Sequence, residues 1–425
     1  MSVQAARDFL AAKQDDLIDF LQTLVTTPSI TVEMGERTIA DRVKAVGRDL
    51  GLGEPDVLAA VPEHPNLLYR FDGPDPGPTL ILNAHLDTQP VGDPSAWTHD
   101  PFAADTVDGR MYGLGTSDMK GAVAALVYAC AALVQTDAIP AGRVLLALVA
   151  NEEAGGTYGA DWLVRHGHVT GDACVVCEPA GVRQEWEAIY NGQRGQSGVW
   201  VRVSGDQMHS GVAHILGARN AAVRMARVMD QLDRALRITA ADPALGVAQA
   251  TLGVGIRCGV AWGINPGVAD FGIDVRTTPG MTQDDVARGM EDSLAVVRQV
   301  HADIETQWWF DAPPRDWIAP TRAAPESGVV RAAQHAAEIV LGQIPPLGTY
   351  PATTDASAFE AVGGIPTLAA LGPGRISLAH KADEYVTLAS VIEAAHLYAV
   401  LATLYLAEAK TGRMATVPDE NRRRE

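Results

Sequence analysis

Apolar residues in the first 190 positions fall into short continuous runs that alternate with helical patterns. The runs occupy residues 80–87, 143–153 and 172–179. Continuous runs of this length are typical of strands buried on both faces of a parallel sheet. Helical patterns occupy residues 6–24, 35–50, 121–134 and 158–167. This alternation predicts an α/β domain.

The pattern changes after residue 190. Residues 198–205 alternate apolar and polar side chains, as a strand with one exposed face does. Further strands are predicted at residues 251–259, 269–279 and 303–310, and helices at residues 218–236 and 282–301. The order β-α-β-β-α-β is that of a ferredoxin-like domain.

The first pattern then resumes, with a helix at residues 326–342, a strand at 365–372 and a long helix at 387–410. The sequence therefore predicts two domains. Residues 1–190 and 313–425 form the α/β domain, and residues 191–312 form a second domain inserted into it.

The net charge of the chain argues against two classes of partner. The chain carries 33 Lys and Arg against 52 Asp and Glu, a net charge of −19. Nucleic acids and anionic membranes attract clustered Lys and Arg, so neither is expected as a partner. The acidity is uneven, because residues 191–310 contain 11 Arg, no Lys and 12 acidic residues.

The location and redox state follow from the N-terminus and the cysteines. The first 20 residues lack the basic flank and apolar core of a signal peptide. The longest apolar stretch, residues 122–134, is shorter than the roughly 18 residues of a membrane span. Cys174 and Cys177 form a C-x-x-C, which we interpret as two core residues of a strand, with a redox or zinc pair as the alternative. We expect a cytoplasmic protein.

Histidines and carboxylates recur at the ends of predicted strands and in the loops that follow, where open α/β sheets form their sites. They are His85, Asp87, Asp118, Glu152, Glu153, Glu178 and His380. Converging carboxylates repel each other unless they bind a cation or change their pKa values. A mixed set of nitrogen and oxygen ligands suits zinc, with Co²⁺ or Mn²⁺ as substitutes.

Two local spacings assign further roles. His85 and Asp87 lie at positions i and i+2, on one face of a strand, where the carboxylate can hold the second ring nitrogen of a metal-binding imidazole. The adjacent Glu152 and Glu153 must diverge, so one can bind metal while the other acts as a base.

Five motifs in series carry a family resemblance. They are HLD at residues 85–87, GLGTSDMKG at 113–121, NEEAGG at 151–156, CEP at 177–179 and H-x-x-D-E at 380–384. In this order they resemble the dinuclear-zinc deacylases and carboxypeptidases, a family that includes acetylornithine deacetylase, succinyl-diaminopimelate desuccinylase, aminoacylase and glutamate carboxypeptidase. The resemblance implies an α/β/α catalytic domain with an inserted lid and dimerisation domain.

The resemblance also implies roles for individual residues. His85, Asp118 and Glu178 match the ligands of one zinc ion, and Asp118, Glu153 and His380 match those of a second. Asp118 would bridge the two ions. Asp87 matches the residue that supports His85, and Glu152 matches the general base.

Residues of the inserted domain match positions that act on the substrate. His209 matches a histidine that reaches the partner's site across a homodimer, with an ordinary surface histidine as the alternative. Asn265 and Arg276 match positions that bind a substrate carboxylate, with a structural ion pair as the alternative for Arg276. In the α/β domain, Gly374 and Thr354 match stretches that line the site.

An aromatic run, Trp308, Trp309 and Phe310, has two interpretations. Core packing by Trp308 and Phe310, which share a strand face, is the preferred one, and an aromatic acyl pocket is the alternative.

Together these features predict a metal-dependent amidohydrolase. Its substrate would be an N-acyl amino acid or a dipeptide-like molecule with a carboxylate. The resemblance favours a deacylase because Glu stands at position 178, where peptidases of the family more often carry Asp. A dipeptidase or carboxypeptidase is the alternative, and a catalytically silent binding protein is disfavoured because the whole ligand set is present.

Overall fold

The apolar run that ends at His85 is the central strand of a six-stranded sheet. β3 (Thr79–His85) is buried at every position after Thr79 and runs parallel to its neighbours β6 (Arg143–Val149) and β7 (Ala173–Val176). The sheet order is β1-β2-β6-β3-β7-β19. The predicted parallel sheet is confirmed for β6, β3, β7 and β19 (Thr367–Leu368). Two further strands, β1 (Asp56–Leu58) and β2 (Asn66–Asp72), were not predicted, and they add to the sheet in antiparallel orientation.

The structure is a computed structural model that describes residues 3–31, 33–239, 241–242 and 246–410. The chain divides into two units. The first contains Met1–Gly192, Arg322–Gly348 and Thr354–Glu425, and the second contains Gln193–Thr321 and Thr349–Thr353. The C-terminal part of the predicted α/β domain, residues 411–425, lies outside the described residues.

The second unit continues to Thr321, past residue 312, where the inserted domain is predicted to end. The Gly198 amide donates to the Arg315 carbonyl, and Gln196 and Ile318 exchange two backbone hydrogen bonds. These bonds tie residues 313–321 to the first strand of the second unit.

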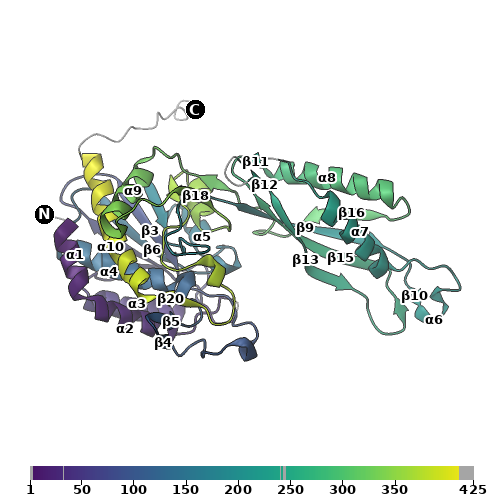
Figure 1. Cartoon of the computed structure of the whole chain (residues 1–425), viewed down its shortest axis with the longest axis horizontal. Helices are drawn as coiled ribbons and strands as arrows, with labels where there is room; N and C mark the ends of the chain where they lie inside the picture. The colour runs from purple at the N-terminus through teal and green to yellow at the C-terminus, as the bar shows by residue number, and fades with distance from the viewer. Residues whose placement is uncertain (1–2, 32, 240, 243–245, 411–425) are drawn as a thin grey trace. The chain divides into compact units, whose positions relative to one another are not determined.

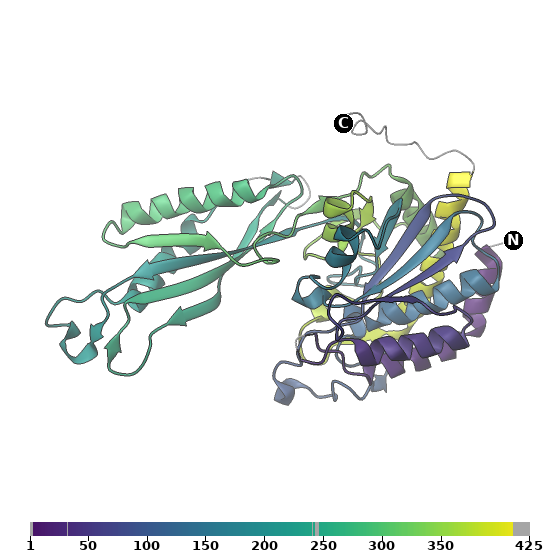
Figure 2. The ribbon, with the colours of Figure 1, turned by 180° about the vertical axis from the view of Figure 1, so that it is seen from behind.

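The helices of the first unit pack in layers beside the sheet (Figures 1 and 2). α4 and α10 pack against each other and against β3, and α1 and α2 pack on α4. The helices are α1 (Val3–Ala12), α2 (Gln14–Val25), α3 (Arg37–Asp49), α4 (Gly121–Gln135), α5 (Ala160–Arg165), α9 (Gly328–Leu341) and α10 (Leu388–Lys410). The single helix predicted at residues 6–24 is two helices, because the chain leaves helical geometry at Lys13.

Two helical segments are longer than residues 122–134, the longest apolar stretch noted in the sequence. Thr116–Gln135 and Leu388–Glu408 have the length and composition to cross a membrane. However, 94% and 61% of their most apolar windows are buried inside the protein. Their apolar character is thus explained by packing in the core, where α4 has 13 buried residues.

Short elements complete the first unit and the connections to the second. The turns are η1 (Pro94–Ala96), η2 (Thr116–Lys120), η3 (Glu152–Ala154), η4 (Ser357–Val362) and η5 (Ile376–Leu378). One small sheet contains β4 (Thr106–Val107), β5 (Arg110–Tyr112) and β20 (Tyr385–Thr387), and another contains β8 (Ile189–Gln193), β17 (Thr321–Arg322) and β18 (Leu347–Tyr350).

The second unit has the predicted ferredoxin-like order. β9 (Gly195–Ser204), β13 (Gln249–Cys258), β15 (Val268–Thr277) and β16 (Thr306–Phe310) form an antiparallel sheet in the order β13-β15-β9-β16. α7 (Ala221–Ala235) follows β9, and α8 (Gln283–Val300) follows β15. The remaining elements are β10 (Met208–His209), α6 (Ser210–Ala213), β11 (Ala241–Asp242), β12 (Gly246–Val247) and β14 (Ile264–Asn265).

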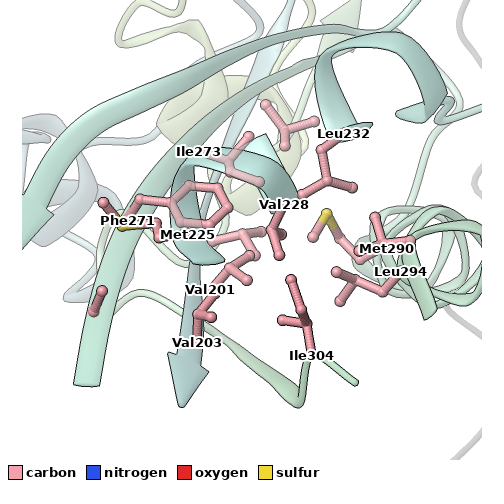
Figure 3. Packing of buried hydrophobic residues seen from close by; sticks show 14 of the residues in the cluster. Val201, Val203, Met225, Val228, Leu232, Phe271, Ile273, Met290, Leu294 and Ile304 are labelled. Atoms are coloured by element: carbon pink, nitrogen blue, oxygen red, sulfur yellow. The ribbon is translucent and has the colours of Figure 1, made fainter. Parts of the chain in front are cut away.

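The core of this unit lies between the sheet and its two helices (Figure 3). Alternate residues of β9 are buried, and Val201 packs in a cluster with Phe271 and Met290. Trp308 and Phe310 pack against the same cluster with their rings edge to face at 5.2 Å. This confirms core packing for the aromatic run, while Trp309 lies on the other face beside Arg202.

Candidate metal centre

Parallel strands bring the predicted ligands to one edge of the sheet. His85 ends β3, Glu153 follows β6 and Glu178 follows β7. The register places His85 opposite Val149 and Asn83 opposite Val176, so the three strands end together. The carboxyl ends of parallel strands are where open α/β sheets build their sites.

The first candidate site consists of His85, Asp118 and Glu178, all buried. The Nε2 atom of His85 lies 3.0 Å from Asp118 Oδ1 and 3.4 Å from Glu178 Oε1. One ligand atom from each residue lies within 4.8 Å of the other two, which is close enough for a single ion. Cys174 and Cys177, on and just after β7, are buried free thiols outside this group.

The second candidate site shares Asp118 and adds Glu153 and His380. His380 Nε2 lies 3.2 Å from Asp118 Oδ2 and 3.1 Å from Glu153 Oε2. Gln89 holds Glu153 through its side-chain amide, which donates to Glu153 Oε2 at 3.0 Å and to the Glu153 carbonyl at 2.9 Å. The two carboxylate oxygens of Asp118 therefore face two different groups of ligand atoms.

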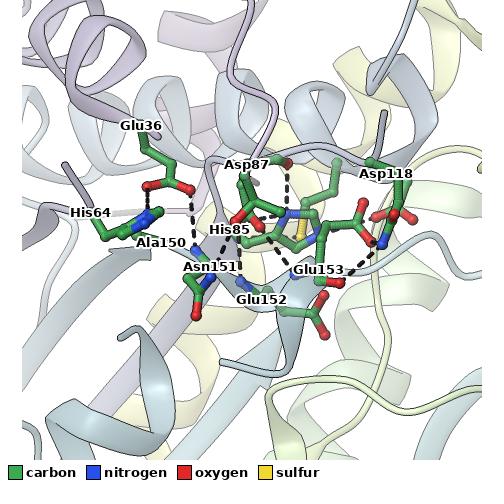
Figure 4. Close-up of polar contacts among 12 residues, drawn as sticks. Glu36, His64, His85, Asp87, Asp118, Ala150, Asn151, Glu152 and Glu153 are labelled. Atoms are coloured by element: carbon green, nitrogen blue, oxygen red, sulfur yellow. Dashed lines mark hydrogen bonds and ion pairs between the residues drawn. The ribbon is translucent and has the colours of Figure 1, made fainter. Parts of the chain in front are cut away.

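Asp87 supports this edge through both its main-chain carbonyl and its carboxylate (Figure 4). Its main-chain carbonyl, 3.0 Å from His85 Nδ1, is the partner of the imidazole, while its carboxylate is 3.6 Å away. The carboxylate also accepts the amides of Glu152 at 3.1 Å and Glu153 at 3.0 Å. One buried residue thus fixes both the His85 ring and the turn that carries the two glutamates.

The pKa shifts of the ionisable side chains at this site are those expected of a site that binds cations. Burial, followed by repulsion from Asp118, raises the pKa of Glu178 to about 8. Hydrogen bonds to Asp118 and Glu153 raise the pKa of His380 to about 11. Each imidazole points one nitrogen at two carboxylate oxygens, His85 at Asp118 and Glu178 and His380 at Asp118 and Glu153. Divalent ions bind such converging nitrogen and oxygen atoms, and Zn²⁺, Co²⁺ or Mn²⁺ would suit the set.

Glu152 lies beside the two candidate metal sites and belongs to neither. Burial raises its pKa well above the usual value, and Glu178 and Asp355 raise it further. A buried carboxylate whose pKa is raised is suited to act as a general base or acid. Asp355 is itself buried, with one oxygen that has no hydrogen-bond partner. Asp355 belongs to the segment TTDAS, residues 353–357, in which the family resemblance pointed to the neighbouring Thr354.

Gly374 and Thr354 have structural functions. A Cβ atom on Gly374, whose φ is +89°, would lie 2.3 Å from Ser117 Oγ, so glycine lets this loop pack against the Asp118 loop. The Thr354 hydroxyl donates to the Ala369 carbonyl and accepts the Ala356 amide. Its neighbour Thr353 is the one whose hydroxyl accepts from Arg276, at 3.4 Å.

The second unit contains three of the predicted site residues, His209, Asn265 and Arg276. His209 is exposed at the end of β10, where its Nδ1 atom accepts the Gly211 amide at 3.1 Å. Asn265, paired with β10, is buried and donates to the carbonyls of Asp206 at 2.7 Å and Arg219 at 3.1 Å. It therefore holds the loop that contains His209.

Arg276 forms the ion pair that was its alternative interpretation, at 2.9 Å from Asp274 Oδ2. Its side chain remains 30% exposed on β15, so a further partner can still reach the guanidinium.

A parallel α/β sheet with paired His and carboxylate sites at one edge, together with an inserted antiparallel domain, defines the architecture of dinuclear metallopeptidases and their relatives. Residues 81–404 match the model of peptidase family M20/M25/M40. The chain belongs to this family, which confirms the resemblance of its motifs.

Known relatives support the family and the fold. Succinyl-diaminopimelate desuccinylase 1 of Ruegeria sp. (strain TM1040) is 36% identical over 221 residues, which are 51% of this chain and 56% of that protein. The chain thus spans about half the length of the curated relatives it matches.

Solved structures cover more of the chain at lower identity. Human carnosine dipeptidase 1 covers 96% of this chain and 99% of its own, with a TM-score of 0.74 and 18% identity. The M20 family metallo-carboxypeptidase Sso-CP2 of Sulfolobus solfataricus covers 92% and 98%, with a TM-score of 0.71 and 21% identity. These likenesses show the fold.

Proposed function

We propose that this protein is a dinuclear metallohydrolase that cleaves the amide bond of an N-acyl amino acid. The observation that carries the proposal is the pair of ligand groups that share Asp118. His85 and Glu178 would complete one metal site, and Glu153 and His380 the other. Two zinc ions are the proposed occupants, with Co²⁺ or Mn²⁺ as substitutes.

The roles of the residues follow from their positions. Bound cations would supply Lewis-acid polarisation of the scissile carbonyl and would acidify the attacking water. The Glu152 carboxylate would take the proton of that water and return it to the leaving amine. Asp87 would keep Glu152 in place through its hydrogen bond to the Glu152 amide.

The metal requirement can be tested by removal and restoration. Exhaustive chelation should abolish hydrolysis of an N-acyl amino acid, and addition of Zn²⁺ or Co²⁺ to the dialysed protein should restore it. The measurement is the rate of amine release together with the metal content of each sample. Hydrolysis that continues in metal-free protein would contradict the proposal.

The substrate class is proposed from two observations. The curated relatives at 33–38% identity in the matched region are succinyl-diaminopimelate desuccinylases. Arg276 offers an exposed guanidinium, which pairs well with a substrate carboxylate. A dipeptidase or carboxypeptidase is the alternative, and the solved structures with those names agree with the fold.

A substrate panel separates the two possibilities. Acetyl, succinyl and aromatic-acyl amino acids should be hydrolysed with a higher kcat/KM than dipeptides that share the same C-terminal residue. The reverse order would establish the dipeptidase alternative. Removal of the substrate's carboxylate as an amide should raise KM in either case, because charge pairing with Arg276 is lost.

A further inference from the structure

The carboxylate of Glu384 lies beneath the loop that presents Asp118. The side chain is buried, and the residue is 1% exposed. Its oxygens accept three backbone amides, from Gly115 at 3.0 Å, Ser117 at 2.8 Å and Asp118 at 3.0 Å. A carboxylate that accepts several amides fixes the direction of each N–H group and hence the course of the backbone. Glu384 therefore sets the conformation of the Asp118 loop.

Glu384 also belongs to the segment that carries the other ligand of the second site. It lies four positions after His380, and its own carbonyl accepts the Gly113 amide at 2.9 Å. The next residues form β20, which pairs with β5 just before the Asp118 loop. The loop that presents Asp118 and the segment that presents His380 are thus joined through one residue.

The surroundings of Glu384 require an acceptor at this position. Gly115 adopts a φ of +77°, and a Cβ atom there would lie 2.5 Å from Thr88 Cγ2, so the loop is tightly enclosed. The amides that point inward would be buried without partners if the carboxylate were absent, which is costly. Lys120, also buried, donates to the Thr27 carbonyl at 3.0 Å and interacts electrostatically with Glu384.

We propose that Glu384 is the positioning residue of the second metal site. By holding the Asp118 loop against the His380 segment, it keeps the two ligands that this site needs within reach of one ion. The inference rests on the proposed dinuclear centre. Loss of the clamp displaces both Asp118 and His380 from the second site, whereas the first site loses the alignment of Asp118 alone and retains His85 and Glu178.

The Glu384→Gln variant tests this role. Glutamine keeps the shape of the side chain but places an NH₂ donor against at least one backbone amide. Calorimetric titration of the metal-free protein with Co²⁺ should give two binding events for the wild type. In the variant the second event should weaken by about tenfold or more, the range seen when groups that support metal ligands are removed. The first event should weaken less.

Two further variants serve as controls. Asp383→Asn changes the neighbouring carboxylate, which accepts the amides of Thr98 at 2.8 Å and His99 at 3.1 Å, whereas the amides of the Asp118 loop are held by Glu384. It should keep both Co²⁺ affinities. Glu384→Asp retains the charge with a shorter reach and should fall between the wild type and Glu384→Gln.

Each outcome decides the matter. Selective weakening of the second event in Glu384→Gln supports the inference. Unchanged affinities, equal weakening of both events, or the same loss in Asp383→Asn overturns it. If near-UV circular dichroism shows that Glu384→Gln is unfolded, the ratio of the two affinities in Glu384→Asp decides by the same criteria. A wild type that binds fewer than two Co²⁺ ions overturns the dinuclear centre and this inference with it.

Discussion

At the scale of single residues, the buried carboxylates divide into those that face ligand atoms and those that hold backbone. Asp118 and Glu178 point their oxygens at His85 Nε2. Asp87 and Glu384 accept backbone amides and so build the turns on which Glu152 and Asp118 lie. Because hydrogen bonds to a carboxylate are strong in a low dielectric, each of these residues defines a local geometry rather than adding charge alone.

Glu152→Gln separates proton transfer from metal binding. The amide cannot accept the proton of water, so kcat should fall by about 10²- to 10⁴-fold. Metal content should stay at the wild-type value, because Glu152 belongs to neither ligand group. Steady-state kinetics and elemental analysis of the same sample check both statements. Glu326→Gln, at an exposed position, is the matched control, and a near-normal kcat in Glu152→Gln would require another base.

At the scale of elements, the turns between strands and helices carry the site, and the regular elements only bring them together. Another turn, η4, lies outside both ligand groups and is tied to β17 because its Glu360 accepts the Arg322 amide at 3.2 Å. One oxygen of this carboxylate is buried without a hydrogen-bond partner. Burial raises the pKa of Glu360 to about 7.

This raised pKa makes stability depend on pH. The folded state binds the Glu360 proton more tightly than the unfolded state, so its contribution is complete below about pH 4.5 and is lost as the pH rises through 7. The Glu360→Gln variant has no carboxyl group at this position, so it does not lose stability in this way as the pH rises. Its free energy of unfolding, relative to the wild type, should therefore increase between pH 5 and pH 8 by about 1–2 kcal/mol.

Urea unfolding of both proteins in the presence of a chelator measures this difference. Glu338→Gln, an exposed position on α9, should show no comparable change between the two pH values. A difference between Glu360→Gln and the wild type that is independent of pH would contradict the prediction.

At the scale of the whole molecule, the two units have different compositions. Residues 191–310 are almost neutral, and the rest of the chain carries nearly all of the −19 charge. The second unit exposes apolar side chains around the loop of His209, including Ile215, Leu216 and Trp262. Exposed apolar groups of this kind mark association surfaces. They support the proposal that this unit forms a homodimer and that His209 acts in the partner's site.

Subunit complementation tests this arrangement. His209→Ala and Glu153→Ala should each lose most activity. A mixture refolded together should regain part of it, because a heterodimer can combine the metal ligands of one subunit with the His209 of the other. The measurement is the specific activity of the mixture against each variant refolded alone. Absence of any gain in proven heterodimers would argue against a role for His209 across the interface.

The sequence by itself predicted the fold class and the order of elements in the inserted domain, and through the family resemblance it predicted the candidate ligand set. Continuous apolar runs predict buried strands, period-two alternation predicts half-exposed ones, and both patterns are local. The five motifs were equally readable, because ligands must have particular side chains at the ends of particular strands. The resemblance of these motifs implied His85, Asp118, Glu153, Glu178 and His380 as ligands, and the structure brings them together in two candidate groups.

Tertiary structure alone decided which atoms meet. The carboxylate of Asp87 accepts two amides of the glutamate turn as well as lying 3.6 Å from the His85 ring, and Thr353 contacts Arg276. Glu384 was visible as the last letter of H-x-x-D-E, but its partners lie more than 260 positions earlier in the chain. Such partners depend on how distant loops pack and where backbone amides point, and no local pattern of side chains encodes that direction.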